Sequence, residues 1–291
     1  MSHVLTLVID RAAGTLTPAI IARVRDAIQG GEPAVLSEGE ATDIPTPTLP
    51  HLAAVEQALE GAPIDAIATK ARGRRKGLLV ADMDSTIVTT ETLDEIAAYA
   101  GLKEKIAAIT RRSMNGEIDF SRALRERVAM LKGLSIDALE KTWQRTQLTP
   151  GARELVATMR AHNATTALVS GGFTYFTARV AKLAGFDQHH ANTLLDDGAV
   201  LTGKVGEPVL GRDAKLELLR RLAAARGLRR SATLAVGDGA NDLAMLLEAG
   251  LGSAFHAKPV VAAAARAQVR HGTLRAVLFA QGYRAREIRG E

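Results

Sequence analysis

The sequence lacks cysteine altogether, and only 3% of its 291 residues are aromatic. Without cysteine there are no disulfide bonds, thiolate metal ligands or cysteine nucleophiles, and a reducing cytoplasmic location is the default expectation. The formal charge of +5 is scattered in small groups with few aromatic residues, so we expect no nucleic-acid partner. The densest basic group, residues 70–76, is interpreted as a solvated linker or a lead-in to the following strand, with a patch for an anion or a partner as the alternative.

Long apolar runs are missing as well. No window approaches the roughly 18 consecutive apolar residues of a membrane-spanning helix. The first residues do not resemble a secretory signal, because Asp10 and Arg11 interrupt the apolar run that begins at Val4. We therefore expect no membrane partner. Hydrophobic residues still make up 47% of the chain, enough for one large domain or two modest ones.

Residues 1–76 have a pattern of their own. Thr17 and Pro18 are typical of a helix start, and prolines break the chain at residues 45–50. The order of elements resembles a small ferredoxin-like α+β module of the ligand-sensing kind, with a purely structural appendage as the alternative. By analogy alone, such a module makes a homodimer an expectation. We expect strands at residues 4–9, 33–36 and 64–68, and helices at 18–28 and 52–59.

From residue 77 onward, apolar strands alternate with helices, which is typical of an α/β doubly wound parallel sheet. The expected strands are residues 77–81, 165–169, 232–236 and 251–255. The first two are separated by far more chain than one crossover helix needs, which predicts an inserted domain. Four helices are expected in this insert, at residues 92–100, 104–110, 119–131 and 135–145.

These patterns divide the chain into an N-terminal region, residues 1–76, and a core, residues 77–291, with a helical cap inserted at about 92–148. A cap that follows the first strand of the core can close over a site at the end of that strand. A second excursion is expected at residues 189–206, where Asp196-Asp197-Gly198 favours a hairpin.

Acidic residues follow two of the expected strands. The first strand leads into DMDST at residues 82–86, and the third leads into GDGAND at residues 237–242. Parallel strands place their carboxyl ends at one edge of the sheet, so the two clusters should meet there. Because clustered carboxylates repel one another, we expect a hard divalent cation such as Mg²⁺ between them. A glycine-rich turn in which Asn241 or Asp242 caps the next helix is the alternative for the second cluster.

Asp82 and Asp84 are suited to phosphoryl transfer. One carboxylate can attack phosphorus while the other moves a proton, although the D-x-D pattern alone also fits a metal ligand or a loop residue. Ser170-Gly171-Gly172 follows another strand and can offer hydrogen bonds to phosphoryl oxygens. Lys215 lies in an expected helix from which it can reach the same edge and neutralise charge.

Taken in order, DMDST, Ser170, Lys215 and GDGAND resemble the four motifs of the haloacid dehalogenase-like phosphatases, over roughly residues 77–275. The resemblance implies that Asp82 is the nucleophile and Asp84 the general acid and base. It further implies that Mg²⁺ is bound by Asp82, Asp238 and the backbone carbonyl of Asp84, with Asp242 in support. The phosphate group would be held by Ser170, Gly171, Lys215 and Asn241.

The insert resembles the cap of family members that hydrolyse O-phospho-L-serine, the last step of serine biosynthesis. This resemblance lies in residues 91–95, 114–120 and 124–128. It implies that Glu91 binds the substrate ammonium group and Arg127 its carboxylate, with Met114 and Phe120 forming an apolar wall. The alternatives are a helix-terminal charge at Glu91 and a surface role for Arg127. The alternative functions are a phosphatase that acts on another small amine-bearing phosphate, and an amino-acid sensor with a vestigial acidic site.

Overall fold

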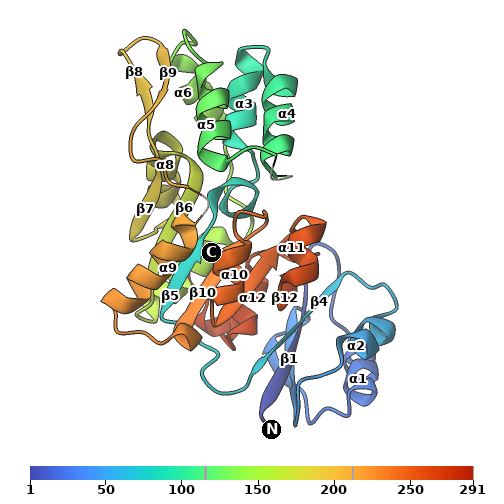
Figure 1. Cartoon of the computed structure of the whole chain (residues 1–291). Helices are drawn as coiled ribbons and strands as arrows, with labels where there is room; N and C mark the ends of the chain where they lie inside the picture. The colour runs from blue at the N-terminus through green and yellow to red at the C-terminus, as the bar shows by residue number, and fades with distance from the viewer. Residues whose placement is uncertain (115–116, 212, 291) are drawn as a thin grey trace.

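The computed structural model describes residues 1–114, 117–211 and 213–290. Figure 1 shows an N-terminal α+β region at one end, a central sheet with flanking helices, and a helical cap at the opposite end. Within the described ranges, none of the helices has the length and apolar character needed to span a membrane.

The central sheet has six parallel strands in the order β12-β11-β10-β5-β6-β7. This confirms the predicted doubly wound α/β fold. The strands are β5 (Leu78–Ala81), β6 (Thr165–Phe173), β7 (Gln188–Asn192), β10 (Thr233–Gly237), β11 (Leu251–Phe255) and β12 (Ala267–Val269). The helices of the core are α7 (Ala152–Ala161), α8 (Thr174–Ala184), α9 (Ala214–Ala225), α10 (Leu243–Glu248), α11 (Pro259–Ala264) and α12 (Arg275–Ala280).

Side chains on both faces of the sheet are buried because helices cover each face. Leu79 and Ala81 of β5 pack in the cluster that includes α7, α8 and α12. Leu78 and Val80 point the other way and pack with α9, α10 and α11. This two-sided burial explains why β5 is a continuous apolar run without alternation.

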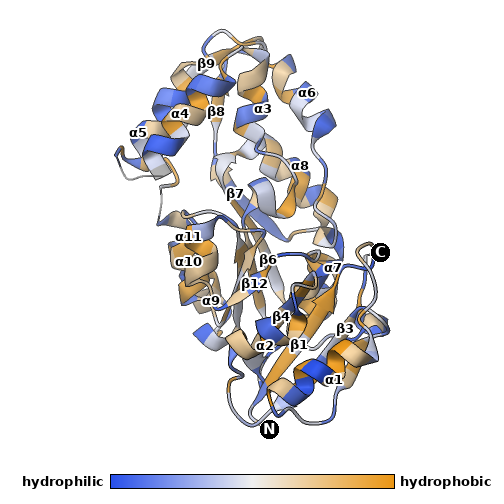
Figure 2. Ribbon diagram, turned by 90° about the vertical axis from the view of Figure 1, so that its right-hand side faces the viewer, coloured by the Kyte–Doolittle hydropathy of each residue, from blue (hydrophilic) through white to orange (hydrophobic). Residues whose placement is uncertain are grey.

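Two strands of the central sheet were not predicted from the sequence. β12 has three residues, and β7 is made of Gln188–Asn192, which are polar apart from one alanine and appear blue in Figure 2. Both lie at the edges of the sheet, where less apolar surface is buried. The expected excursion therefore starts after β7, and the hairpin within it consists of β8 (Leu194–Asp196) and β9 (Leu201–Val205).

The cap contains the four predicted helices, α3 (Thr92–Tyr99), α4 (Lys103–Met114), α5 (Phe120–Ala129) and α6 (Asp137–Arg145). The hairpin β8–β9 extends this cap, as Figure 1 shows. The Gly133 N–H donates to the Leu201 carbonyl, and the Leu201 N–H donates to the Leu134 carbonyl, each at 2.9 Å. Two separate excursions from the core thus form one body above the sheet edge.

The N-terminal region folds as an antiparallel sheet in the order β2-β3-β1-β4, with two helices on one face. Its opposite face, including Val8 and Ile67, packs into the same apolar cluster as α12 of the core. Both faces of this sheet are therefore covered within one chain. The elements are β1 (His3–Ile9), α1 (Pro18–Ala27), β2 (Ala34–Ser37), β3 (Ala41–Thr46), α2 (Leu52–Leu59) and β4 (Ile64–Lys70).

The basic segment at residues 70–76 leads into β5, as expected, but the prediction that it is solvated is wrong for two of its residues. Arg74 pairs with Asp43 at 2.7 Å and also donates to the carbonyls of Phe279 and Ala280. Lys76 is buried, and its ammonium group donates to the carbonyls of Gly73 and Ser231. These cations attach the N-terminal region to the core.

A second buried ion pair crosses the same junction. Glu40 is 3% exposed and accepts hydrogen bonds from Arg275 of α12 at 2.8 and 3.1 Å and from Ser37 at 2.7 Å. Arg11 also lies 2.8 Å from the Glu40 carboxylate. Removing the carboxylate would leave the buried Arg275 guanidinium without this partner.

We expect Glu40→Ala to lower the free energy of unfolding by about 3–5 kcal/mol, the usual cost of breaking a buried ion pair. Urea denaturation followed by circular dichroism measures the change. Glu38→Ala is the matched control, because Glu38 lies exposed in the same turn. A Glu40→Ala variant as stable as Glu38→Ala would show that the ion pair contributes nothing to the docking of the N-terminal region.

Candidate active site

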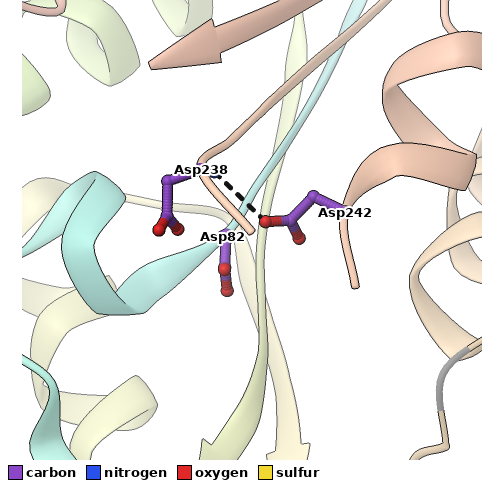
Figure 3. Close-up of side chains that lie close together, drawn as sticks. All are labelled: Asp82, Asp238 and Asp242. Carbon is purple, nitrogen blue, oxygen red and sulfur yellow. Dashed lines mark hydrogen bonds between the residues drawn. The ribbon is translucent and has the colours of Figure 1, made fainter. Parts of the chain in front are cut away.

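The two acidic loops meet because their strands are neighbours in register. Val236 of β10 pairs with Ala81 of β5, and the Asp82 N–H donates to the Val236 carbonyl at 2.9 Å. The next residues of both strands therefore leave the sheet at the same edge. Asp82, Asp238 and Asp242 are buried there, with carboxylate oxygens within 4.8 Å of one another (Figure 3).

Asp242 closes its own loop instead of capping the helix that follows. Its carboxylate accepts the N–H groups of Gly239 at 3.0 Å and Asp238 at 3.2 Å, and it makes no cap hydrogen bond to α10. Gly237 is required for this packing, since a Cβ there would lie 2.5 Å from the Asp242 carboxylate. The capping alternative for Asp242 is therefore wrong.

Lys215 projects from the start of α9 into this cluster. Its ammonium nitrogen lies 2.7 Å from Asp82 Oδ1 and 2.5 Å from Asp242 Oδ1. Burial alone would lower the pKa of Lys215, but the carboxylates of Asp242 and Asp82 raise it, so the ammonium group remains charged. Lys215 thus holds the two carboxylates in place and supplies one positive charge.

The cluster still carries excess negative charge. Burial and the neighbouring Asp242 raise the pKa of Asp82, and the same two causes raise that of Asp238 to about 6. Lys258 lies 3.8 Å from Asp238 but is 43% exposed, so solvent screens part of its charge. The three buried carboxylates offer only oxygen atoms as ligands, which suits a hard divalent cation. Such a cation would balance the negative charge.

Asp84 faces the same space from the turn after β5. Its carboxylate accepts the Thr92 N–H at 2.8 Å and the Ser170 hydroxyl at 3.2 Å. Burial, followed by the nearby Glu91, raises the pKa of Asp84 to about 6. A carboxyl group with this pKa can give up and take back a proton near neutral pH.

Ser170 and Gly171 follow the buried part of β6 at the same edge. The Ser170 hydroxyl accepts the Gly172 N–H at 2.8 Å while it donates to Asp84. At Gly171 a Cβ would lie 3.0 Å from the ring of Phe120, so glycine lets the cap approach this loop. Small groups here leave room for a ligand between cap and core.

A cavity of about 490 Å³ joins the edge of the sheet to the cap. Lys215 and Asp242 lie outside its lining, in contact with Asp82. Met114 ends α4, and its side chain lies outside the described part of the structure. The predicted site residues that line the cavity are Asp82, Asp84, Glu91, Phe120, Arg127, Ser170, Gly171, Asp238 and Asn241.

Glu91 and Arg127 provide opposite charges in the cap side of this cavity. Glu91 precedes α3, and the Ser85 hydroxyl donates to its carboxylate at 2.8 Å. Arg127 of α5 donates to the Thr110 hydroxyl at 3.1 Å and to the Ala123 carbonyl at 3.2 Å. Among the described residues, no carboxylate lies within ion-pair distance of the Arg127 guanidinium, which leaves it available to an anionic ligand.

Sequence reasoning missed several residues of this site. Ser85 orients Glu91 from a left-handed backbone conformation, with φ of 53°, which a non-glycine residue rarely adopts. The Thr86 hydroxyl donates to Asp238 at 3.4 Å. Thr92 donates its backbone N–H to Asp84, and the sequence carries no signal for this contact because any residue except proline has such a group. Lys258 could have been predicted to lie near the site, because it follows β11, which ends at the same edge of the sheet.

Comparison with known proteins gives the class of this site. Residues 79–247 match the family model of the haloacid dehalogenase-like hydrolases. The chain therefore belongs to this family, and the resemblance inferred from its motifs is confirmed.

Within the family, the chain is similar to phosphoserine phosphatases. It is 45% identical over 203 residues to that of Streptococcus thermophilus, covering 70% of this chain and 94% of the relative. It is 40% identical over 256 residues to the phosphoserine phosphatase of Streptomyces coelicolor, and this match covers 88% of this chain and 62% of the relative. A solved phospho-aspartyl intermediate analogue of phosphoserine phosphatase superposes with a TM-score of 0.65 at 40% identity, covering 70% of this chain and 98% of that one.

Proposed function

We propose that this chain is a phosphoserine phosphatase, which hydrolyses O-phospho-L-serine to L-serine and inorganic phosphate. One observation carries the proposal: a single cavity contains a pair of phosphoryl-transfer carboxylates and, on its cap side, Glu91 and Arg127. A serine head group carries an ammonium and a carboxylate, so it needs one anion and one cation. The phosphate end of the same molecule would then lie over Asp82.

In the first step, the Asp82 carboxylate attacks phosphorus, and the bond between phosphorus and the seryl oxygen breaks. Asp84 donates its proton to that oxygen, so serine leaves as the neutral alcohol. The pKa of about 6 supports a protonated fraction of Asp84 for this role. The enzyme then carries an acyl phosphate on Asp82.

In the second step, Asp84 takes a proton from water, whose oxygen attacks the same phosphorus atom. The bond between phosphorus and Asp82 breaks, which restores the carboxylate and releases inorganic phosphate. Ser170, Gly171 and Asn241 line the cavity and would donate hydrogen bonds to the phosphoryl oxygens, and Lys215 would add its charge from beside Asp82.

Mg²⁺ is the proposed cofactor, held by Asp82, Asp238 and the Asp84 backbone carbonyl, with Asp242 in support. When bound, it neutralises charge on the phosphoryl oxygens and favours the ionised form of the attacking carboxylate. The activity would complete serine biosynthesis in the cytoplasm.

A panel of phosphate esters tests the proposal. With Mg²⁺ present, kcat/KM for phosphoserine should exceed that for phosphoethanolamine, which lacks the carboxylate, by about a hundredfold or more. A phosphoester of lactate, which lacks the amine, should be disfavoured similarly. Chelation with EDTA should abolish turnover, and added Mg²⁺ should restore it. Equal kcat/KM values for phosphoserine and phosphoethanolamine would refute serine as the substrate.

A further inference from the structure

Two further cavities lie next to the active-site cavity and share lining residues in series. The first, of about 10 Å³, shares Phe120, Ser170, Gly171 and Asn241 with the active-site cavity and also touches Lys215. It has room for about one water molecule. The residues proposed to hold the phosphate group are therefore the common wall of the two cavities, and Glu91 and Arg127 line only the active-site cavity.

The second cavity, of about 320 Å³, lies beyond this constriction. It shares Val169, Leu210 and Ala214 with the first, and its remaining walls are His190, Glu217, Leu218 and Arg221. The three cavities thus form a series that runs from the cap, past the phosphate position, to a face of the core beside β7 and α9.

Leu210 stands at the constriction and is held there by one buried amide. The Leu210 N–H donates to Asn192 Oδ1 at 2.7 Å. Asn192, 2% exposed at the end of β7, donates in turn to the Gly171 carbonyl at 3.0 Å. The same side chain therefore connects the loop that would bind phosphate with the residue that narrows the passage.

The outer cavity is suited to an oxyanion. Arg221 is exposed on α9, and in the described ranges no carboxylate lies within ion-pair distance of it. His190 is half-buried on the opposite wall, with its Nε2 atom 3.0 Å from the Gln188 side chain. Glu217 lies one helical turn before Arg221 and is the acidic residue at this mouth.

We propose that inorganic phosphate leaves the enzyme through this passage, past Leu210 and toward Arg221, while serine leaves through the cap side. The proposal rests on the proposed function, which places the two products at opposite ends of the active-site cavity. Because phosphate is larger than one water molecule, Leu210 must move aside for it to pass. Arg221 then attracts the anion on its way out.

The test follows both products of one turnover in the full-length enzyme with Mg²⁺. After rapid mixing with phosphoserine, serine is measured in acid-quenched samples, and free phosphate is measured with a fluorescent phosphate-binding reporter. Leu210→Trp fills the constriction and Leu210→Ala widens it. Arg221→Ala removes the outer cation, and Arg220→Ala is its matched control, because Arg220 pairs with Glu248 on another side of the helix.

Leu210→Trp should slow phosphate release by about tenfold while the serine burst keeps its rate, whereas Leu210→Ala should release phosphate at least as fast as the natural enzyme. Arg221→Ala should slow phosphate release by about threefold at low salt, and Arg220→Ala should not. Unchanged phosphate release in Leu210→Trp, or equal slowing of serine and phosphate, would overturn the exit route alone. A natural enzyme that forms no serine would refute the proposed function, and the exit route with it.

Discussion

Asp82→Asn is expected to reduce turnover of phosphoserine by at least about a thousandfold, as the loss of a covalent nucleophile does. The substitution keeps the shape of the side chain and retains an oxygen that can accept from Lys215 and the Met83 N–H, its present partners at 2.7 and 2.8 Å. It removes the charge and the nucleophilic oxygen. The fold should therefore survive while the chemistry stops.

The decisive measurement is the phosphoenzyme itself. Enzyme mixed with labelled phosphoserine and quenched in acid should carry label in the natural protein and none in Asp82→Asn. Asp84→Asn is the informative comparison, because it keeps the nucleophile and removes the proton donor, so labelling should be slow but present. Asp26→Asn, at an exposed position on α1, controls for nonspecific effects. Labelled Asp82→Asn protein would assign the nucleophile to another residue.

The catalytic edge of the sheet was predictable from the sequence because one rule governs it. The carboxyl ends of adjacent parallel strands meet, and the apolar runs before DMDST and GDGAND identified two such strands. In the structure, Val236 pairs with Ala81, and this pairing brings the two acidic loops together. Lys215 was harder to place, since a helical lysine carries no signal of its own until the carboxylates around it are known.

What escaped prediction depends on contacts between segments far apart in the sequence. β7 is a polar strand that owes its place to pairing with β6, and Asn192 at its end acts on Gly171 and Leu210. Arg74 looked like part of a solvated basic run, yet its side chain is only 11% exposed and pairs with Asp43 of the N-terminal region. Periodicity reports which face of an element is apolar, but it does not report which polar groups meet across an interface.

The division of labour in the site also explains why substrate choice should be separable from chemistry. The carboxylates that would break the phosphate ester come from loops of the sheet, whereas Glu91 and Arg127 come from the cap side. A change in the cap can therefore alter which ester is selected without removing the nucleophile. Thr110 would contribute to this selection, because its hydroxyl accepts a hydrogen bond from the Arg127 guanidinium.

Arg127→Ala is accordingly expected to lower kcat/KM for phosphoserine by about two to three orders of magnitude, equivalent to about 3–4 kcal/mol, because a buried charge pair with the substrate carboxylate is lost. The loss for phosphoethanolamine should be small, since that ester has no carboxylate. For Arg127→Lys, kcat/KM for phosphoserine should lie between the values of the natural enzyme and Arg127→Ala, because lysine keeps the charge but lacks the planar guanidinium group.

Arg125→Ala is the matched control, two residues away on α5 and paired with Glu207 on the exposed side. It should leave both substrates unaffected, and thermal unfolding of all variants should exclude loss of the cap as the cause. Burial lowers the pKa of Arg127 while Asp94 and Glu91 oppose that shift, and an arginine guanidinium keeps its charge in proteins. Equal losses on phosphoserine and phosphoethanolamine would therefore mean that Arg127 supports the cap and does not bind the carboxylate, and recognition of serine would have to be assigned to other residues of the cavity.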